Sequence, residues 1–133
     1  MYEDLRCIET TLHEKIREAL IRRFGDTESG WWRQGVPESV RLRCQERREK
    51  DTDEPCQVFC YSDLLDLDSV LQDQWLLLNN LFPEYRANRK ELSKDLRKLN
   101  RIRNKIMHPV RGWVPDETDF DFVRRLQRAL RCS

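Results

Sequence analysis

Long hydrophobic runs are missing from this sequence, and glycine and proline are scarce. No stretch approaches the roughly 18 consecutive apolar residues of a membrane span, and the first residues (Met-Tyr-Glu-Asp) show no signal-peptide pattern. Only four glycines and five prolines are available for turns, which argues against a β-sandwich or barrel. We therefore expect a helix-rich, soluble, cytoplasmic protein with no membrane segment.

Histidine and cysteine are too few, or too far apart, for an obvious metal site. The five cysteines are an odd number, and they lack the two closely spaced pairs of a zinc ribbon. Cys56 and Cys60 could contribute two ligands, but the two histidines, His13 and His108, are distant from them in the sequence. We expect reduced, partly buried thiols, no metal and no cofactor.

Neither sign of charge is in clear excess, but the charges are unevenly distributed. The chain has 25 Lys and Arg against 24 Asp and Glu, a net charge of +1, so the whole molecule attracts nucleic acid only weakly. From Arg86 to Arg111, however, there are ten Lys or Arg and two acids, whereas Asp63 to Asp73 holds four Asp and no base. The basic segment is a candidate phosphate surface, although ordinary helical proteins carry similar segments.

Apolar residues recur at three- and four-residue steps, the pattern of amphipathic helices. They predict five helices, over about residues 3–24, 37–50, 62–82 (continuous or kinked), 88–108 and 117–131. Ser62 and Asn88 are the expected N-caps of the third and fourth helices, and Asn88 would form a capping box with Glu91. Residues 58–61 are expected to be a short extended segment. The pattern predicts one all-α domain over residues 1–133, an up-and-down bundle of four to five helices.

The tryptophans include an adjacent pair, Trp31 and Trp32, next to a turn. Adjacent side chains on a helix point about 100° apart, so both can be buried only where layers meet. We expect them to plug the core beneath a loop, and a base-stacking platform is the alternative. Trp75 lies in the most apolar segment and is expected in the core. His13 falls off the apolar stripe of the first helix and is expected at the surface.

The fourth predicted helix ends in the sequence Arg-Asn-Lys-Ile-Met-His, residues 103–108. In projection, Arg103 falls inside the apolar stripe, whereas Asn104 and His108 lie one turn apart at its edge. An unpaired arginine is costly to bury, so Arg103 must be paired, extend towards solvent or face another protein. Pairing with an acid such as Asp66 or Asp68 would make its role structural.

These side chains also have a usable chemistry. Histidine exchanges protons near neutral pH, with an unperturbed pKa of about 6.5. Arginine is a permanent cation whose planar fork fits phosphate oxygens, and asparagine can orient a neighbour or a substrate. RNA supplies its own nucleophile, the ribose 2′-hydroxyl, so a base, an acid and a cation would suffice without a metal.

The same three residues carry a family resemblance. Arg103, Asn104 and His108, at the end of a helix in a small helical bundle, resemble the signature of the HEPN superfamily: an Arg, a polar residue and a His a few positions beyond. More of the chain is similar to one subgroup, the Swt-type HEPN domain. In order over residues 5–130, the similar features are the amphipathic first helix, Trp31-Trp32 with Val36-Pro37, Tyr61 before Ser62-Asp63-Leu64-Leu65, Trp75, and the Arg-Asn-His run.

The resemblance implies a helical bundle that dimerises so that two copies of the motif meet at one cleft. It implies metal-independent endoribonuclease activity, as in toxins, antiviral effectors and RNA-processing proteins. Arg103 would stabilise the charge on the phosphate, and His108 would act as acid or base. Asn104 would orient a neighbouring side chain or the substrate. The expected RNA-binding residues are the neighbouring cations Arg101, Lys105 and Arg111. An antitoxin or a fused regulatory domain is a further partner that the family suggests.

Two interpretations remain open from the sequence. The first is a homodimeric ribonuclease. The second is a non-catalytic RNA-binding or protein-interaction module, also found in the family, in which Arg103 and His108 support an interface between helices. The intact motif favours the first, and the near-zero net charge favours the second.

Overall fold

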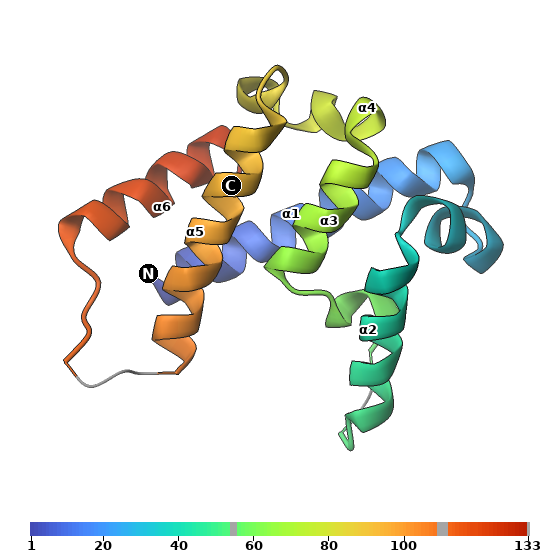
Figure 1. Cartoon of the computed structure of the whole chain (residues 1–133), viewed down its shortest axis with the longest axis horizontal. Coiled ribbons are helices and arrows are strands. Elements are labelled where there is room, and N and C mark those ends of the chain that lie inside the picture. Colours follow the sequence, from blue (N-terminus) through green and yellow to red (C-terminus); the bar gives the residue numbers. More distant parts are fainter. Residues whose placement is uncertain (54–55, 109–111, 133) are drawn as a thin grey trace.

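The computed structural model of the chain, which describes residues 1–53, 56–108 and 112–132, is all-α (Figure 1). Its α-helices are α1 (Tyr2–Phe24), α2 (Glu38–Lys50), α3 (Leu64–Asp73), α4 (Trp75–Leu78), α5 (Arg89–Met107) and α6 (Glu117–Ala129). Between them lie a π-helix, η1 (Glu28–Gly35), and three 3-10 helices, η2 (Val58–Tyr61), η3 (Asn79–Leu81) and η4 (Pro83–Tyr85). The described residues contain no strand, which confirms the predicted all-α class. None of their helices is long and apolar enough to cross a membrane.

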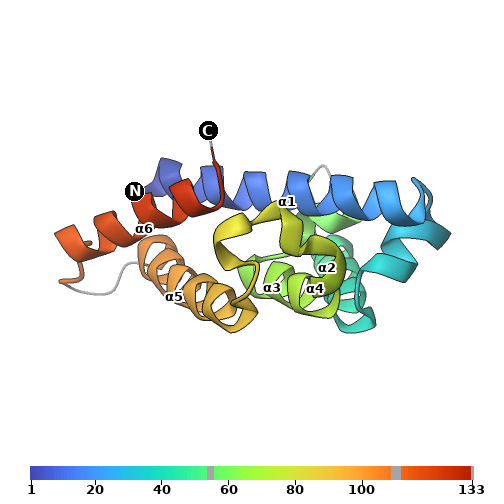
Figure 2. The ribbon, with the colours of Figure 1, turned by 90° about the horizontal axis from the view of Figure 1, so that it is seen from above.

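Helix α1 spans the molecule and lies across the other long helices (Figures 1 and 2). In Figure 2 it runs along one side, with α5, α3 and α2 on the other side and α6 next to its N-terminal part. Its buried face is an apolar stripe at three- and four-residue steps, made of Leu5, Ile8, Leu12, Ile16 and Leu20. Gly25, at a φ of 94°, ends the helix as predicted. A single helix therefore contributes to the core along the whole molecule.

One hydrophobic core joins these helices. Helices α3 and α5 lie side by side against α1, and their apolar faces meet it. The fully buried side chains of α3, α4 and α5 include Leu64, Leu67, Leu71, Leu78, Leu92, Leu96 and Leu99. Trp75 is also buried, as its apolar surroundings in the sequence predicted.

A pair of aspartates marks the start of helix α3, and another pair marks the start of α6. The Asp63 carboxylate accepts a hydrogen bond from the backbone N–H of Asp66 (2.9 Å), and the Asp66 carboxylate accepts one from the Asp63 N–H (3.1 Å). Asp116 and Asp119 exchange the same two bonds at the start of α6. Each pair is a capping box, which satisfies two amide groups that a helix leaves unpaired.

The structure corrects three local expectations. Ser62 does not cap α3, because its hydroxyl donates to the Phe59 carbonyl (2.6 Å) instead. Asn88 precedes α5 as predicted, but its side chain makes no cap hydrogen bond. Residues 58–61 form a 3-10 helix rather than an extended segment. The third predicted helix has the interrupted form that the sequence allowed: α3 ends at Asp73, and the chain continues as α4 after Gln74.

The adjacent tryptophans lie in the π-helix η1, and both are buried. Trp31 and Trp32 pack edge-to-face, with ring centroids 5.7 Å apart, and both also contact the ring of Phe59. The core role is therefore confirmed, because both rings are almost entirely covered by their neighbours. His13 was wrongly expected at the surface: it is half-buried, its ring contacts Phe59, and its Nε2 lies 3.2 Å from the Ser62 carbonyl oxygen.

A buried carboxylate links α2 to α3. Asp66 accepts hydrogen bonds from Arg43 (2.8 Å) and Arg47 (2.5 Å), both of which are partly exposed on α2. Burial alone would raise the pKa of Asp66, but the hydrogen bonds from Arg47, from the Asp63 backbone and from Arg43 together hold it below its usual value. One of the four aspartates of the acidic segment, Asp66, is thus fully engaged inside the protein.

The two terminal helices of the described chain are joined to each other. Gln127 of α6 donates from its amide to the Asp4 carboxylate of α1 (3.2 Å), and the Lys15 ammonium donates to the Leu130 carbonyl (2.8 Å). Leu126 and Leu130 are fully buried beneath these bonds. Helix α6 therefore depends on α1, from the other end of the sequence, for much of its packing.

Candidate functional site

The predicted motif lies at the C-terminal end of α5. Arg103, Asn104 and Lys105 belong to the last turns of the helix, which ends at Met107. His108 is the capping residue: its backbone N–H still donates to the Asn104 carbonyl (2.8 Å), but its φ of −126° and ψ of 79° are no longer helical. The motif therefore occupies the last turn of one helix, as the sequence predicted, with its histidine at the point where the chain leaves that helix.

Arg103 points towards α1, not towards the acidic segment. Its Nε donates to the carboxylate of Glu9 at 2.5 Å, and the two side chains are 32% and 28% exposed. The expectation that a structural partner would be Asp66 or Asp68 was wrong: Asp66 binds arginines of α2, and Asp68 accepts from the Ser93 hydroxyl (2.8 Å). An acid does neutralise Arg103, but it comes from the first helix.

A small cleft lies beside this ion pair, between the start of α1 and the end of α5. Its volume is about 190 Å³, and its lining consists of Tyr2, Leu5, Arg6, Glu9, Arg103 and Met107. Arg6 and Arg103 give the cleft two cations against one carboxylate, so its net character is basic. An anionic group the size of a phosphate would meet the planar fork of Arg103 here.

The other two motif side chains lie elsewhere on α5. Asn104 and His108 are exposed, and His108 does not line the cleft beside Arg103. This follows from helical geometry, because Arg103 projects into the apolar stripe while Asn104 and His108 project near its outer edge. One chain thus brings Arg103 and Glu9 together but does not bring His108 to the same cleft.

The predicted RNA-binding cations have different surroundings. Arg101 is exposed on α5 and lines a groove towards α3. Lys105 is exposed, and its ammonium lies 5.5 Å from the ring centre of Trp113, a cation–π contact. Arg111 lies outside the described residues. The two cations that the structure describes therefore flank the motif on the outer face of α5.

Exposed apolar side chains surround the motif. Tyr2 is 51% exposed and Met107 is 45% exposed on the rim of the cleft beside Arg103. A neighbouring hollow of about 270 Å³, lined by Ile106, Trp113 and Val114 among others, adds to this apolar area. Exposed apolar area next to a partly buried ion pair is typical of a surface that another protein covers.

No protein-family model, no curated protein and no solved structure matches this chain. Its function must therefore be inferred from its own side chains.

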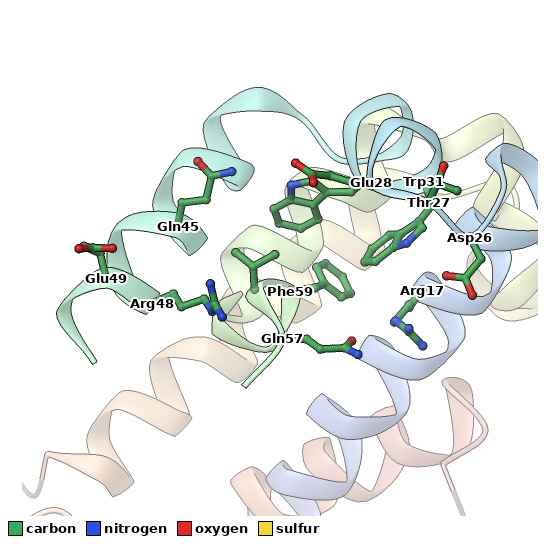
Figure 3. A pocket seen from close by; sticks show the side chains of 12 residues that line it. Arg17, Asp26, Thr27, Glu28, Trp31, Gln45, Arg48, Glu49, Gln57 and Phe59 are labelled. Atoms are coloured by element: carbon green, nitrogen blue, oxygen red, sulfur yellow. The ribbon is translucent and has the colours of Figure 1, made fainter. Parts of the chain in front are cut away.

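Another cleft, larger than the one beside Arg103, is separate from the motif. It measures about 570 Å³ and lies between α1, η1, α2 and η2. Figure 3 shows Arg17 of α1 and Arg48 of α2 facing it from opposite sides, with Phe59 between them. The guanidinium of Arg17 lies over the Trp31 ring at 5.5 Å, and its buried Nε has no hydrogen-bond partner among the described residues.

The chemistry of this larger cleft is mixed. Asp26, Glu28 and Glu49 line it together with the two arginines, so the charges of its walls nearly cancel. Sequence reasoning singled out its tryptophans but missed Arg17, because an arginine on an amphipathic helix resembles any other solvated cation. With both indoles buried and the charges balanced, the cleft offers neither a base-stacking face nor a clear preference for an anion.

The thiols do not form a reactive site. Burial, and then the charge of Asp66, raise the pKa of Cys44 to about 11, so its nucleophilic thiolate is disfavoured. Burial also raises the pKa of Cys60, and Cys56 and Cys60 are both exposed at the surface. Among the residues that the structure describes, no group of three or more His, Cys, Asp or Glu has the arrangement of a metal site.

Proposed function

We propose that this chain is a metal-independent endoribonuclease of the HEPN type that acts as a homodimer in the cytoplasm. The observation that carries the proposal is the arrangement at the end of α5. An arginine held beside a basic cleft is followed, at the point where the helix ends, by an exposed histidine. Those are the two groups that RNA cleavage without a metal requires.

The reaction proceeds through the substrate's own hydroxyl. A base removes the proton of the ribose 2′-hydroxyl, and the O2′–P bond forms as the bond from phosphorus to the 5′ oxygen breaks. An acid protonates the leaving 5′ oxygen, so the products are a 2′,3′-cyclic phosphate and a 5′-hydroxyl. His108 fills the proton-transfer role, Arg103 stabilises the charge on the phosphorane, and Asn104 orients the substrate or His108.

A second copy of the chain solves a geometric problem in this proposal. Arg103 lines the cleft between α1 and α5, whereas His108 follows the end of α5 and does not line that cleft, so one chain presents them to different places. Exposed Tyr2 and Met107 border the Arg103 cleft, and a twofold partner that covers them would bring a second motif to the first. The HEPN-like bundle that we propose for the fold is then half of a composite site.

The decisive experiment compares His108→Ala with wild type on mixed RNA in the presence of EDTA. His108 is exposed, so its loss leaves the core intact while cleavage should fall by about 10²–10⁴-fold. Asn80→Ala, an exposed change on η3 that precedes the other end of α5, is the matched control and should cut at the wild-type rate. Products should end in a 2′,3′-cyclic phosphate. A folded His108→Ala protein that cuts as fast as wild type would exclude this proposal.

One contact favours a second candidate, a non-catalytic dimerisation or RNA-binding module. Glu9 neutralises Arg103 within the chain. A structural arginine requires such a partner, whereas an arginine that binds phosphate must release it first. In that case no RNA is cut under any condition, yet Arg103→Ala still weakens the dimer or the fold. Cleavage by wild type, lost in His108→Ala, separates the two candidates.

A further inference from the structure

A second basic surface lies on α5, away from the cleft of Arg103. It is a groove of about 470 Å³ between α3 and α5. Five cations line it, Arg89, Lys90, Lys94, Arg97 and Arg101, together with the polar side chains of Gln72 and Ser93. No carboxylate belongs to its lining, in contrast to the mixed charges of the cleft between α1, η1, α2 and η2.

Three acids lie on or beside this part of α5. Glu91 is exposed on α5 but does not line the groove, and the other two are engaged inside the protein. Asp68 is buried and accepts from Ser93 (2.8 Å), and Asp95 is buried and accepts from the Tyr85 hydroxyl (2.7 Å). Asp95 also pairs with Arg125 of α6 at 3.5 Å. Within the described parts of the chain, none of the five groove cations takes part in an ion pair.

This arrangement lowers the stability of the free protein. Lys90 and Lys94, and likewise Arg97 and Arg101, stand four residues apart on one helix, and like charges at that spacing destabilise a helix. A cluster that destabilises the fold without an internal partner is suited to an external anion.

The polar side chains of the groove already have partners inside the protein: the Ser93 hydroxyl donates to Asp68 (2.8 Å), and the Gln72 amide donates to Asp68 (3.4 Å) and to the Arg89 carbonyl (3.3 Å). The cations therefore remain as the groups that can bind an external anion.

The cations follow one line along the helix. Projected at about 100° per residue, Lys94, Arg97 and Arg101 point to the side of α5 on which Asn104 lies, near its end. From Lys90 to His108 the helix axis rises about 27 Å, at about 1.5 Å per residue. The line therefore starts in the groove and ends at the exposed histidine of the motif.

We propose that this groove binds the sugar–phosphate backbone of single-stranded RNA and directs the strand along α5 to His108. The choice of RNA as ligand rests on the function proposed above, but the site itself rests on the five cations. A linear polyanion matches a linear row of cations, and Arg97 and Arg101 provide planar forks for its phosphates. An anionic membrane fits less well, because no apolar side chain lines the groove to enter a lipid layer.

The test measures binding without cleavage. The probe is a fluorescent 2′-O-methyl RNA of about 12 nucleotides, within the site sizes of groove-binding proteins, which has no free 2′-hydroxyl to attack. Its affinity for wild type is compared with that for Arg97→Ala/Arg101→Ala over a range of salt concentrations. Both arginines are exposed, so the variant should melt at or slightly above the wild-type temperature.

The expected change is specific in size. Each phosphate contact contributes about 0.7 to the slope of log affinity against log salt for single strands, so losing two should reduce the slope by about 1.4. Near physiological salt the affinity should fall by about tenfold. The matched control, Arg124→Ala/Arg128→Ala, removes the same charge from α6, which lies on the opposite side of α5 from α3 (Figure 1), and should bind like wild type.

Each outcome decides something. Equal affinity and slope for Arg97→Ala/Arg101→Ala and wild type would overturn the proposal. A second result would also overturn it: the protein binds vesicles containing phosphatidylserine, this binding depends on the two arginines, and RNA binding does not. That result would assign the groove to a membrane. If the double variant loses RNA affinity while His108→Ala cuts RNA normally, the groove stands and the catalytic assignment fails.

Discussion

The guanidinium of Arg103 lies at the edge of an apolar helix face, where an unpaired cation would be costly, and Glu9 of α1 compensates its charge. Because both side chains are about 70% covered, the pair is neither a surface salt bridge nor a fully desolvated one. Its contribution to stability should therefore be modest, while its effect on the local potential is large. Glu9 decides how much positive charge the cleft beside Arg103 presents.

Glu9→Gln tests this balance. Glutamine keeps an oxygen that accepts from the Arg103 Nε, so the arginine should stay in place while the neutralising charge is lost. We expect the free energy of unfolding to change by no more than about 1 kcal/mol and RNA affinity to rise severalfold. Glu14→Gln, an exposed change on the same helix, is the control and should alter neither quantity. Unchanged RNA affinity together with a lower melting temperature would assign Arg103 to structure alone.

Asp66 makes a pH-dependent contribution to stability. Its pKa is lowered in the folded protein, so it contributes fully above the unfolded value of about 3.9 and loses this contribution as the pH falls towards the folded pKa. Asp66→Asn should lower the free energy of unfolding by about 2–3 kcal/mol at pH 7. This loss is smaller than for breaking a fully buried ion pair, because Arg43 and Arg47 are partly exposed. Urea denaturation should show the difference from wild type shrinking below about pH 4.

The exposed Asp73, near the end of the same helix, is the control for this measurement. Asp73→Asn should have the same free energy of unfolding as wild type, both at pH 7 and below about pH 4. A stability difference for Asp66→Asn that stays constant down to pH 3 would show that the effect comes from packing and not from the charge.

At the scale of helices, the caps give a matched comparison. The Asp116 carboxylate accepts an amide hydrogen bond at the start of α6, whereas Asn88 makes none at the start of α5. Asp116→Ala should therefore lower the melting temperature by a few degrees, and Asn88→Ala by only a small fraction of that. Thermal denaturation of the two variants measures the difference. Equal losses would mean that Asn88 caps α5 in solution.

The apolar periodicity predicted the long helices well because each buries a single stripe. It identified the buried leucines of α1 and placed the end of α5 near His108 to within a residue. It placed the cap of α3 at Ser62, one residue before the actual cap, Asp63. Adjacent polar residues are equally good candidates in a sequence, and only the structure shows that the hydroxyl of Ser62 binds Phe59 instead. The periodicity also could not foresee a π-helix at Trp31, since that conformation depends on tertiary packing.

The candidate site was predictable in its residues but not in its neighbours. Arg103, Asn104 and His108 could be identified from their spacing and from the end of their helix. Glu9 could not, because it is 94 residues away from Arg103 in the sequence and nothing local distinguishes it from other acids of α1. The groove cations were visible as a basic segment, but only the packing of α3 beside α5 shows which of them line one surface.

For the whole molecule, the proposed site requires a dimer through the end of α5. Met107 is 45% exposed beside Arg103, and Leu76 on α4 is 93% exposed at a different place on the surface. Met107→Glu should convert the dimer to a monomer in sedimentation experiments and abolish cleavage, because a buried charge opposes association. Leu76→Glu should remain a dimer. A wild-type protein that sediments as a monomer would contradict the composite site.

The contact between α1 and α6 has a consequence for the order of folding. Their bonds, Gln127 to Asp4 and Lys15 to Leu130, close loops of more than 100 residues, which is slow for any chain. During synthesis α1 leaves the ribosome before α6, and part of its apolar stripe stays uncovered until α6 has emerged as well. A nascent chain of this protein should therefore be sensitive to proteases and chaperones until residue 130 has left the ribosome. Pulse proteolysis of stalled chains of increasing length would show protection arising only at that point.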